Sequence, residues 1–269
     1  MISVKSATPS YRTSVSTLCH QAAAWALRLL RGKVCVRSAH AFVFSNCTHG
    51  KADSVMATFE LYADTNPSLC ISPSTAVAEV VRRVSPYQVL ELGMHCGYSS
   101  VLLLRLLPPA GRLITVELDP LTAELGEEII LVAGFKHTQF QVLTSSSADA
   151  IPTTSEGLDL VLMDHDPQQY LSDLLALERE ALLRPSGCSV LLIHRNQRAE
   201  DVRGILDQIR TRADHYCINN GNSCFVLVFK TGPLMGNATS FCPNKLIEVS
   251  IFLNIECVMY VSGFIQDEV

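Results

Sequence analysis

The segment from Tyr87 to Ser100, YQVLELGMHCGYSS, constrains the fold of this chain more than any other stretch. An apolar run that holds an acid near its end is followed by a glycine-containing turn, and a second apolar run begins at Val101. This order predicts a strand, a loop and a helix. Gly93 and Gly97 permit positive φ and a close approach of backbone to ligand, and the helix presents free N–H groups. The segment therefore predicts a ligand-binding turn in an α/β fold.

The spacing of this turn argues against a dinucleotide site and against a nicotinamide oxidoreductase. The motif here is E-x-G-x-x-x-G, whereas a tight pyrophosphate turn uses G-x-G-x-x-G. Because the turn is wider and Glu91 precedes it, we expect a nucleoside cofactor that lacks phosphate and carries a cationic amino-acid end. S-adenosylmethionine is such a molecule. A glycine turn that serves packing alone is the alternative.

A second signal follows at Arg112–Leu118, which reads RLITVEL and is closed by Asp119 and Pro120. The run is rich in β-formers and predicts a strand that ends in an acid. In open α/β sheets, a carboxylate at the tip of the second strand binds ribose hydroxyls. We therefore expect Glu117 to bind the ribose, and a solvated loop carboxylate is the alternative.

Five segments in order resemble catechol O-methyltransferase and its close relatives, within a similarity that runs from about residue 51 to 233. They are residues 89–100, 111–120, 148–152, 160–165 and 181–187. The resemblance implies an S-adenosylmethionine-dependent O-methyltransferase that acts on a small phenolic or catechol-type hydroxyl. It also implies a Rossmann-like seven-stranded α/β sheet, mostly parallel, with an antiparallel C-terminal hairpin and helices on both faces.

The resemblance also assigns roles at the cofactor site. It places Ser147 against the adenine ring and His165 beside it, and it gives Asp164 two tasks, magnesium ligation and a contact near the amino group of the cofactor. The backbone of Leu69 would hold the methionine end. The full set of implied cofactor residues is Leu69, Glu91, Gly93, Gly97, Tyr98, Ser99, Glu117, Leu118, Ser147, Asp164 and His165.

The acceptor half departs from the family pattern. The family string D-H-W-K is replaced by residues 164–167, DHDP, which removes the lysine that takes the catechol proton. The strand that ends in A-D-N in the family ends here in Ile193-His194-Arg195. Magnesium prefers near-octahedral oxygen ligands, so an arginine does not replace a ligand. Asp164 is the one predicted ligand of Mg²⁺ that remains. The sequence alone does not decide whether Mg²⁺ binds.

In our interpretation, His194 and Arg195 are the catalytic residues. His194 has the ordinary pKa of a general base at neutral pH, and Arg195 would supply a fixed positive charge that stabilises a phenolate. In the alternative, His194 faces solvent at a strand end. The loss of base and metal ligands also supports a second hypothesis, a cofactor-binding protein without transferase activity that acts through a protein partner.

The two ends of the chain lie outside the similarity, so the sequence predicts a domain at 51–233 between two extensions. Residues 1–50 contain no acid and several Lys and Arg, which is typical either of a mitochondrial transit peptide or of a disordered extension. Residues 234–269 form an appendage of unknown role. Two glutamates interrupt its apolar run at 244–265, so we expect no membrane span.

Charge and cysteine usage restrict partners and compartment. A net charge of −5 gives no indication of a nucleic-acid partner. The chain holds 10 cysteines without a C-x-x-C pair, which favours reduced thiols in an intracellular protein. We therefore expect a cytoplasmic protein, with mitochondrial import as the alternative.

Overall fold

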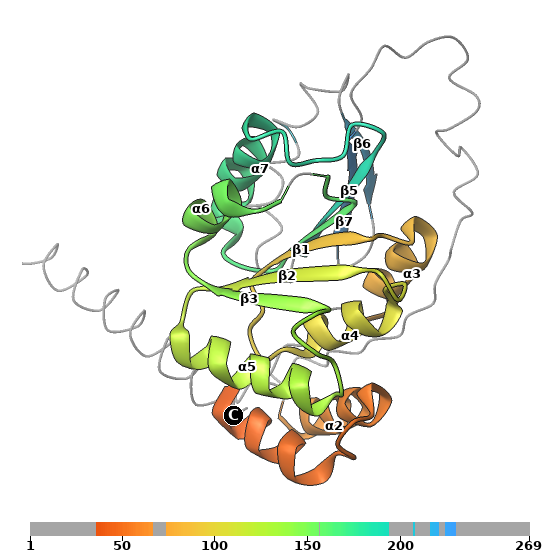
Figure 1. Ribbon diagram of the computed structural model, residues 1–269, viewed down its shortest axis with the longest axis vertical. Helices are drawn as coiled ribbons and strands as arrows, with labels where there is room; N and C mark the ends of the chain where they lie inside the picture. The colour runs from red at the N-terminus through yellow and green to blue at the C-terminus, as the bar shows by residue number, and fades with distance from the viewer. Residues whose placement is uncertain are drawn as a thin grey trace, which may run out of the picture. The chain divides into compact units, whose positions relative to one another are not determined.

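The computed structural model describes residues 36–66, 74–155, 157–193, 207, 216–220 and 224–229 (Figure 1). Its centre is a seven-stranded sheet in the order β3-β2-β1-β4-β5-β7-β6. The strands are β1 (Gln88–Leu92), β2 (Arg112–Glu117), β3 (Phe140–Thr144), β4 (Leu160–Met163), β5 (Cys188–Ile193), β6 (Tyr216–Asn220) and β7 (Cys224–Phe229).

Strands β1 to β5 run parallel to one another. Strand β7 pairs antiparallel with both β5 and β6, so that Cys224 lies opposite Ile193 at the end of β5. The α/β class and the parallel sheet flanked by helices are therefore confirmed. The strand predicted at Arg112–Leu118 ends one residue earlier, at Glu117, because strand ends depend on pairing and not on the residue pattern alone.

Helices connect the parallel strands and precede the first one. They are the helical residues 36–46, α2 (Ala52–Thr65), α3 (Ser74–Val84), α4 (Tyr98–Leu106), α5 (Pro120–Val132), α6 (Ser147–Ala150) and α7 (Tyr170–Arg179), with 3-10 turns η1 (Ile151–Thr153) and η2 (Pro167–Gln169). The sequence also predicts a helix at Glu200–Thr211, which lies almost entirely outside the described residues. None of the described helices is long and apolar enough to span a membrane.

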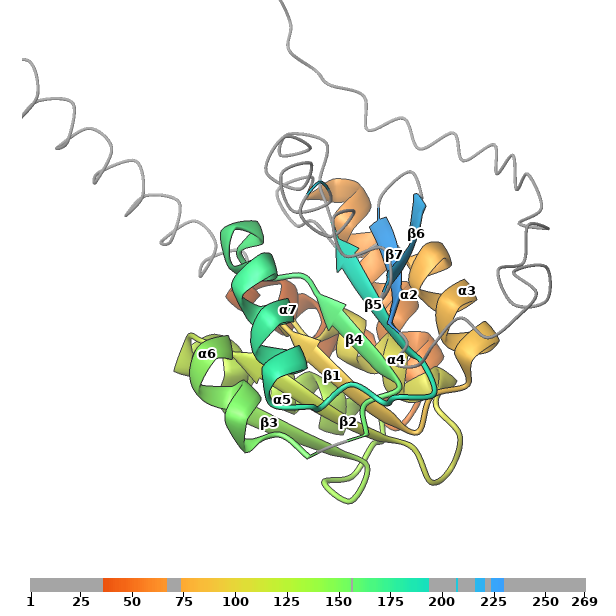
Figure 2. The ribbon, with the colours of Figure 1, turned by 90° about the horizontal axis from the view of Figure 1, so that it is seen from above.

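The sheet has a separate apolar core on each face. Alternate residues of a strand point to opposite faces. Accordingly, Val89 packs with residues of α2, α3, α4 and α5, whereas Leu90 packs with α6, η1 and α7. The two helical layers are visible on either side of the strands in Figure 2. Because both faces are covered, the strands are apolar almost throughout, and the polar chemistry collects at their ends.

The helical residues 36–46 belong to this folded unit. Val36, Ala39 and Val43 are buried in the core that contains α2 and α5. The segment is fixed further on, where the N–H of Gly50 donates to the carbonyl of Val132 at 2.7 Å. The domain boundary predicted at residue 51 stays a prediction, while the helical residues 36–46 pack into the same core as α2 and α5. The proposed appendage at 234–269 lies outside the described residues.

Candidate functional site

The candidate site lies at the carboxyl ends of β1, β2 and β4. Strand β1 is flanked by β2 on one side and β4 on the other, so the chain leaves β1 in one direction along the sheet and returns on the other side. Such a switch point leaves a crevice between the loops that follow the two central strands. Gly93, Glu117 and Asp164 occupy these strand ends, as predicted from their local sequence.

The turn after β1 is packed directly on the backbone that follows β4. Gly93 has φ of +97°, and a Cβ there would lie 2.8 Å from the carbonyl carbon and oxygen of Asp164 and 2.9 Å from the nitrogen of His165. The N–H of Gly93 also donates to Val116 of β2 at 2.9 Å. Both the conformation and the space therefore require glycine at this position.

Glu91 lies beneath this turn and is completely buried. Its Oε2 accepts hydrogen bonds from the hydroxyls of Ser100 at 2.5 Å and Thr115 at 2.6 Å. Burial raises the pKa of Glu91 to about 7, although hydroxyls of Ser100, Ser99 and Thr115 oppose the rise, and the charge of Asp164 adds to it. The hydrogen bonds of Glu91 therefore join β1 to α4 and β2. With a pKa of about 7, its carboxyl loses its proton near neutral pH.

Glu117 is held at the tip of β2 by backbone donors. Its Oε2 accepts from the N–H of His95 at 2.9 Å, and its Oε1 accepts from the N–H of Asp119 at 3.1 Å. Burial raises the pKa of this carboxyl, and the backbone donors oppose that rise. Each carboxylate oxygen has a second lone pair, so the fixed group keeps the capacity to accept a further hydrogen bond. The adjacent Leu118 is 71% exposed and presents apolar surface beside it.

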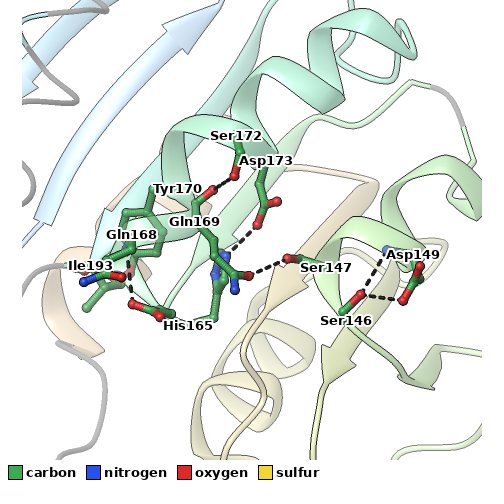
Figure 3. Close-up of polar contacts among 11 residues, drawn as sticks. Ser146, Ser147, Asp149, His165, Gln168, Gln169, Tyr170, Ser172, Asp173 and Ile193 are labelled. Carbon is green, nitrogen blue, oxygen red and sulfur yellow. Dashed lines mark hydrogen bonds and ion pairs between the residues drawn. The ribbon is translucent and has the colours of Figure 1, made fainter. Parts of the chain in front are cut away.

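The loops after β3 and β4 meet at the side chains of Ser147 and Gln169. The Ser147 hydroxyl donates to Oε1 of Gln169 at 3.2 Å (Figure 3). His165, on the same loop as Gln169, lies with Nε2 2.7 Å from Oδ2 of Asp173 on α7. The structure thus brings Ser147 and the loop of His165 together, although their strands are not neighbours in the sheet.

Two predicted cofactor residues have side chains in the core. The Tyr98 hydroxyl donates to Glu60 of α2 at 2.9 Å, and its ring packs edge-on against Phe59. Ser99 is 4% exposed. What these residues present to the crevice is therefore the backbone of the first turn of α4, where N–H groups lack intrahelical partners. Leu69, His194 and Arg195 lie outside the described residues.

Four supporting residues were missed by sequence reasoning. Ser100 and Thr115 bind Glu91, Gln169 binds Ser147, and Asp173 binds His165. No spacing in the sequence indicates these pairs, since each depends on how two separate elements pack.

The described donor atoms do not assemble a magnesium site. Asp164 is half-buried after β4, and the carboxylate of Asp166 accepts from the N–H of Gln168 at the start of η2. Within residues 36–193 and the short strands beyond, apart from the gaps, no three His, Cys, Asp or Glu side chains gather around one point. Since Mg²⁺ prefers six oxygen ligands, these residues do not fit it, and we derive no step through a metal.

The nucleoside cofactor, by contrast, fits the residues present. Glu117, at the tip of β2, offers a fixed acceptor for hydroxyl groups. The first turn of α4 adds free N–H groups. These features suit the polar groups of a nucleoside and of an amino-acid end, and none of them requires a phosphate.

Comparison with known proteins agrees with this geometry. Residues 90–194 match the family model described as a methyltransferase domain. The chain is 47% identical over 120 residues to transmembrane O-methyltransferase from Homo sapiens, a match that covers 43% of this chain and 41% of that relative. It is 41% identical over 110 residues to catechol O-methyltransferase from Mus musculus, which covers 39% of this chain and 41% of that protein.

A solved structure shares the fold. The O-methyltransferase TomG from Streptomyces achromogenes, determined in complex with S-adenosylmethionine (SAM), superposes with a TM-score of 0.51 and 25% identity. That match covers 62% of this chain and 83% of TomG. The matched stretches span about two fifths of the length of the human and mouse relatives.

Proposed function

We propose that this protein transfers a methyl group from SAM to a small phenolic hydroxyl of the catechol type. Its residues 90–194 match a methyltransferase domain, and it is homologous to catechol O-methyltransferase. The proposal goes beyond the matched stretch, because the compared segments cover less than half of the human and mouse relatives. It is supported most directly by the carboxyl ends of β1, β2 and β4, where Glu117 is fixed by two backbone N–H groups.

The described residues bind and orient the cofactor. SAM supplies an electrophilic methyl group on a sulfonium when it is bound. Glu117 would accept hydrogen bonds from the ribose hydroxyls, and the exposed Leu118 would cover one side of the base, with Ser147 and His165 on the other. The turn at Gly93 brings backbone close to the amino-acid end. Rate enhancement then comes chiefly from holding the methyl group in line with the acceptor oxygen.

Removal of the acceptor proton is assigned to His194. This residue and Arg195 follow β5, whose carboxyl end borders the same edge of the sheet as Asp164. We propose that His194 acts as the general base and that Arg195 stabilises the phenolate. Replacement of His194 by Ala with unchanged turnover would remove it from the mechanism.

The proposed activity is tested by transfer of labelled methyl from SAM to a panel of catechols, with Mg²⁺ and again with a chelator. We expect turnover that the chelator does not reduce, because arginine, which stands at position 195, is not a ligand for magnesium. Turnover that is lost on chelation would show that the metal site is assembled from other residues. A protein that binds the cofactor but methylates no phenol would instead support the second hypothesis, action through a protein partner.

The Glu117→Gln variant tests the ribose contact. One amide oxygen replaces two carboxylate oxygens, and the NH₂ group faces a backbone N–H that it cannot accept from. We expect affinity for S-adenosylhomocysteine to fall by roughly 10- to 100-fold, or about 1.4 to 3 kcal/mol. Calorimetric titration of both proteins measures this. The exposed Glu124→Gln on α5 is the matched control, and equal affinities of E117Q and wild type would contradict the role.

A further inference from the structure

The pair formed by His165 and Asp173 is unusually well buried for polar side chains outside a hydrogen-bonded sheet. The side chains are 14% and 5% exposed, and Nε2 of His165 lies 2.7 Å from Oδ2 of Asp173 (Figure 3). Asp173 lies in the first turn of α7, eight residues after His165. A carboxylate this deeply buried is costly unless it is paired, so the contact is a fixed part of the fold.

The contact determines the tautomer of the imidazole. A carboxylate has only acceptor atoms, so the shared proton is on Nε2 of His165. Nδ1 is buried and has no hydrogen-bond partner among the described residues. A proton on Nδ1 would leave a buried donor unsatisfied, which is rarer and more costly than an unsatisfied acceptor. The contact therefore favours a proton on Nε2 and fixes the plane of the ring.

Helix α7 fixes this ring from a second side. The rings of His165 and Tyr170 lie with centroids 5.0 Å apart. Tyr170 is itself anchored, because its buried hydroxyl donates to the carbonyl of Ile193 at the end of β5 at 2.9 Å. Tyr170 and Asp173 are three residues apart, so they lie on one face of the helix. The loop after β4 and the end of β5 are thus held by the same helical turn.

We propose that Asp173 is a positioning residue for the cofactor, which acts by fixing the tautomer and the ring plane of His165. The inference rests on the proposed function, since it assumes that a nucleoside occupies the crevice that His165 borders. The nucleoside base then meets a flat wall that is already ordered, which lowers the entropy lost on binding. Without the carboxylate the ring can rotate or change tautomer, and the wall is no longer preformed.

The variant Asp173→Asn tests this directly, because it keeps the size of the side chain and removes the acceptor-only carboxylate. We expect two changes. Nitrogen-15 NMR of the imidazole should show the Nε2–H tautomer at His165 in the wild type and a mixture of tautomers in D173N, with His165→Gln to assign the signal. Affinity for S-adenosylhomocysteine should fall by about tenfold, while Asp173→Glu, which restores a carboxylate, recovers part of the loss.

Ser172→Ala is the matched control, since Ser172 neighbours Asp173 on the same helix and its exposed hydroxyl bonds only to the backbone of Gln169 among the interactions described. It should leave both the tautomer and the affinity unchanged. A D173N protein with the wild-type tautomer and wild-type affinity would overturn the positioning role. A wild-type protein that fails to bind S-adenosylhomocysteine at all would instead overturn the proposed function, and with it this inference.

Discussion

Replacement of Gly93 by Ala is expected to lower both the stability of the protein and its affinity for the cofactor more than any other single change at the site. The residue has φ of +97°, which costs an L-residue roughly 1–2 kcal/mol. The added Cβ would also lie 2.8 Å from the backbone of Asp164, where no flexible side chain can move away. Together we expect a loss of about 3 kcal/mol in the free energy of unfolding.

The effect on binding follows from what the new methyl group displaces. The backbone of Asp164 and His165 would have to move away from the turn, and both residues border the crevice. We therefore expect affinity for S-adenosylhomocysteine to fall by about 100-fold or more, which corresponds to roughly 3 kcal/mol. Urea unfolding and calorimetric titration of the same protein preparation measure the two quantities separately.

Gly134→Ala provides the control for strain without a change at the site. Gly134 also has φ of +97°, but a Cβ there would meet the backbone of Gly50, at the C-terminal end of α5. This variant should lose stability and keep its affinity for the cofactor. A folded G93A protein that binds as tightly as the wild type would show that the turn does not form part of the cofactor site.

The second large effect is a dependence of stability on pH that Glu91 produces. Its pKa is raised from 4.5 to about 7 in the folded protein, chiefly by burial, so the folded state holds the proton more tightly than the unfolded chain does. Between these two values the folded state binds more protons, and the free energy of unfolding falls as pH rises. A shift of this size corresponds to roughly 3 kcal/mol that is present below pH 4.5 and lost above pH 7.

Glu91→Gln should remove this dependence, because glutamine resembles the protonated acid and does not ionise. At pH 5 the variant and the wild type should be similarly stable, and at pH 8 the variant should be more stable by up to about 3 kcal/mol. Urea unfolding at several pH values gives both curves. Glu79→Gln, an exposed glutamate on α3, is the control. Parallel curves for E91Q and wild type would assign the titration to another group.

The same variant tests whether the charge of Glu91 reaches the cofactor. SAM carries a positive sulfonium, whereas S-adenosylhomocysteine is neutral at that sulfur. If the ionised carboxylate attracts the sulfonium, E91Q at pH 8 should lose affinity for SAM and not for the homocysteine analogue. An unchanged ratio of the two affinities would confine Glu91 to the support of the turn.

The sequence by itself predicted the structural elements that depend only on the residues within them. The E-x-G-x-x-x-G spacing predicts β1, the turn and α4, because glycine alone tolerates the positive φ at that turn. The acids at Glu117 and Asp164 follow apolar runs, and parallel strands bring such ends to one edge. The fold class followed from these patterns, as did the resemblance to catechol O-methyltransferase that the comparisons confirm.

Only the tertiary structure decided which side chains meet. Glu91 and Thr115 are 24 residues apart, and Tyr98 and Glu60 are 38 apart. Such pairs depend on how two elements pack, and no local propensity encodes that. For the same reason, the sequence alone did not predict that the side chain of Tyr98 lies in the core or that the helical residues 36–46 pack against α2 and α5. It also did not predict the pairing of Asp173 with His165.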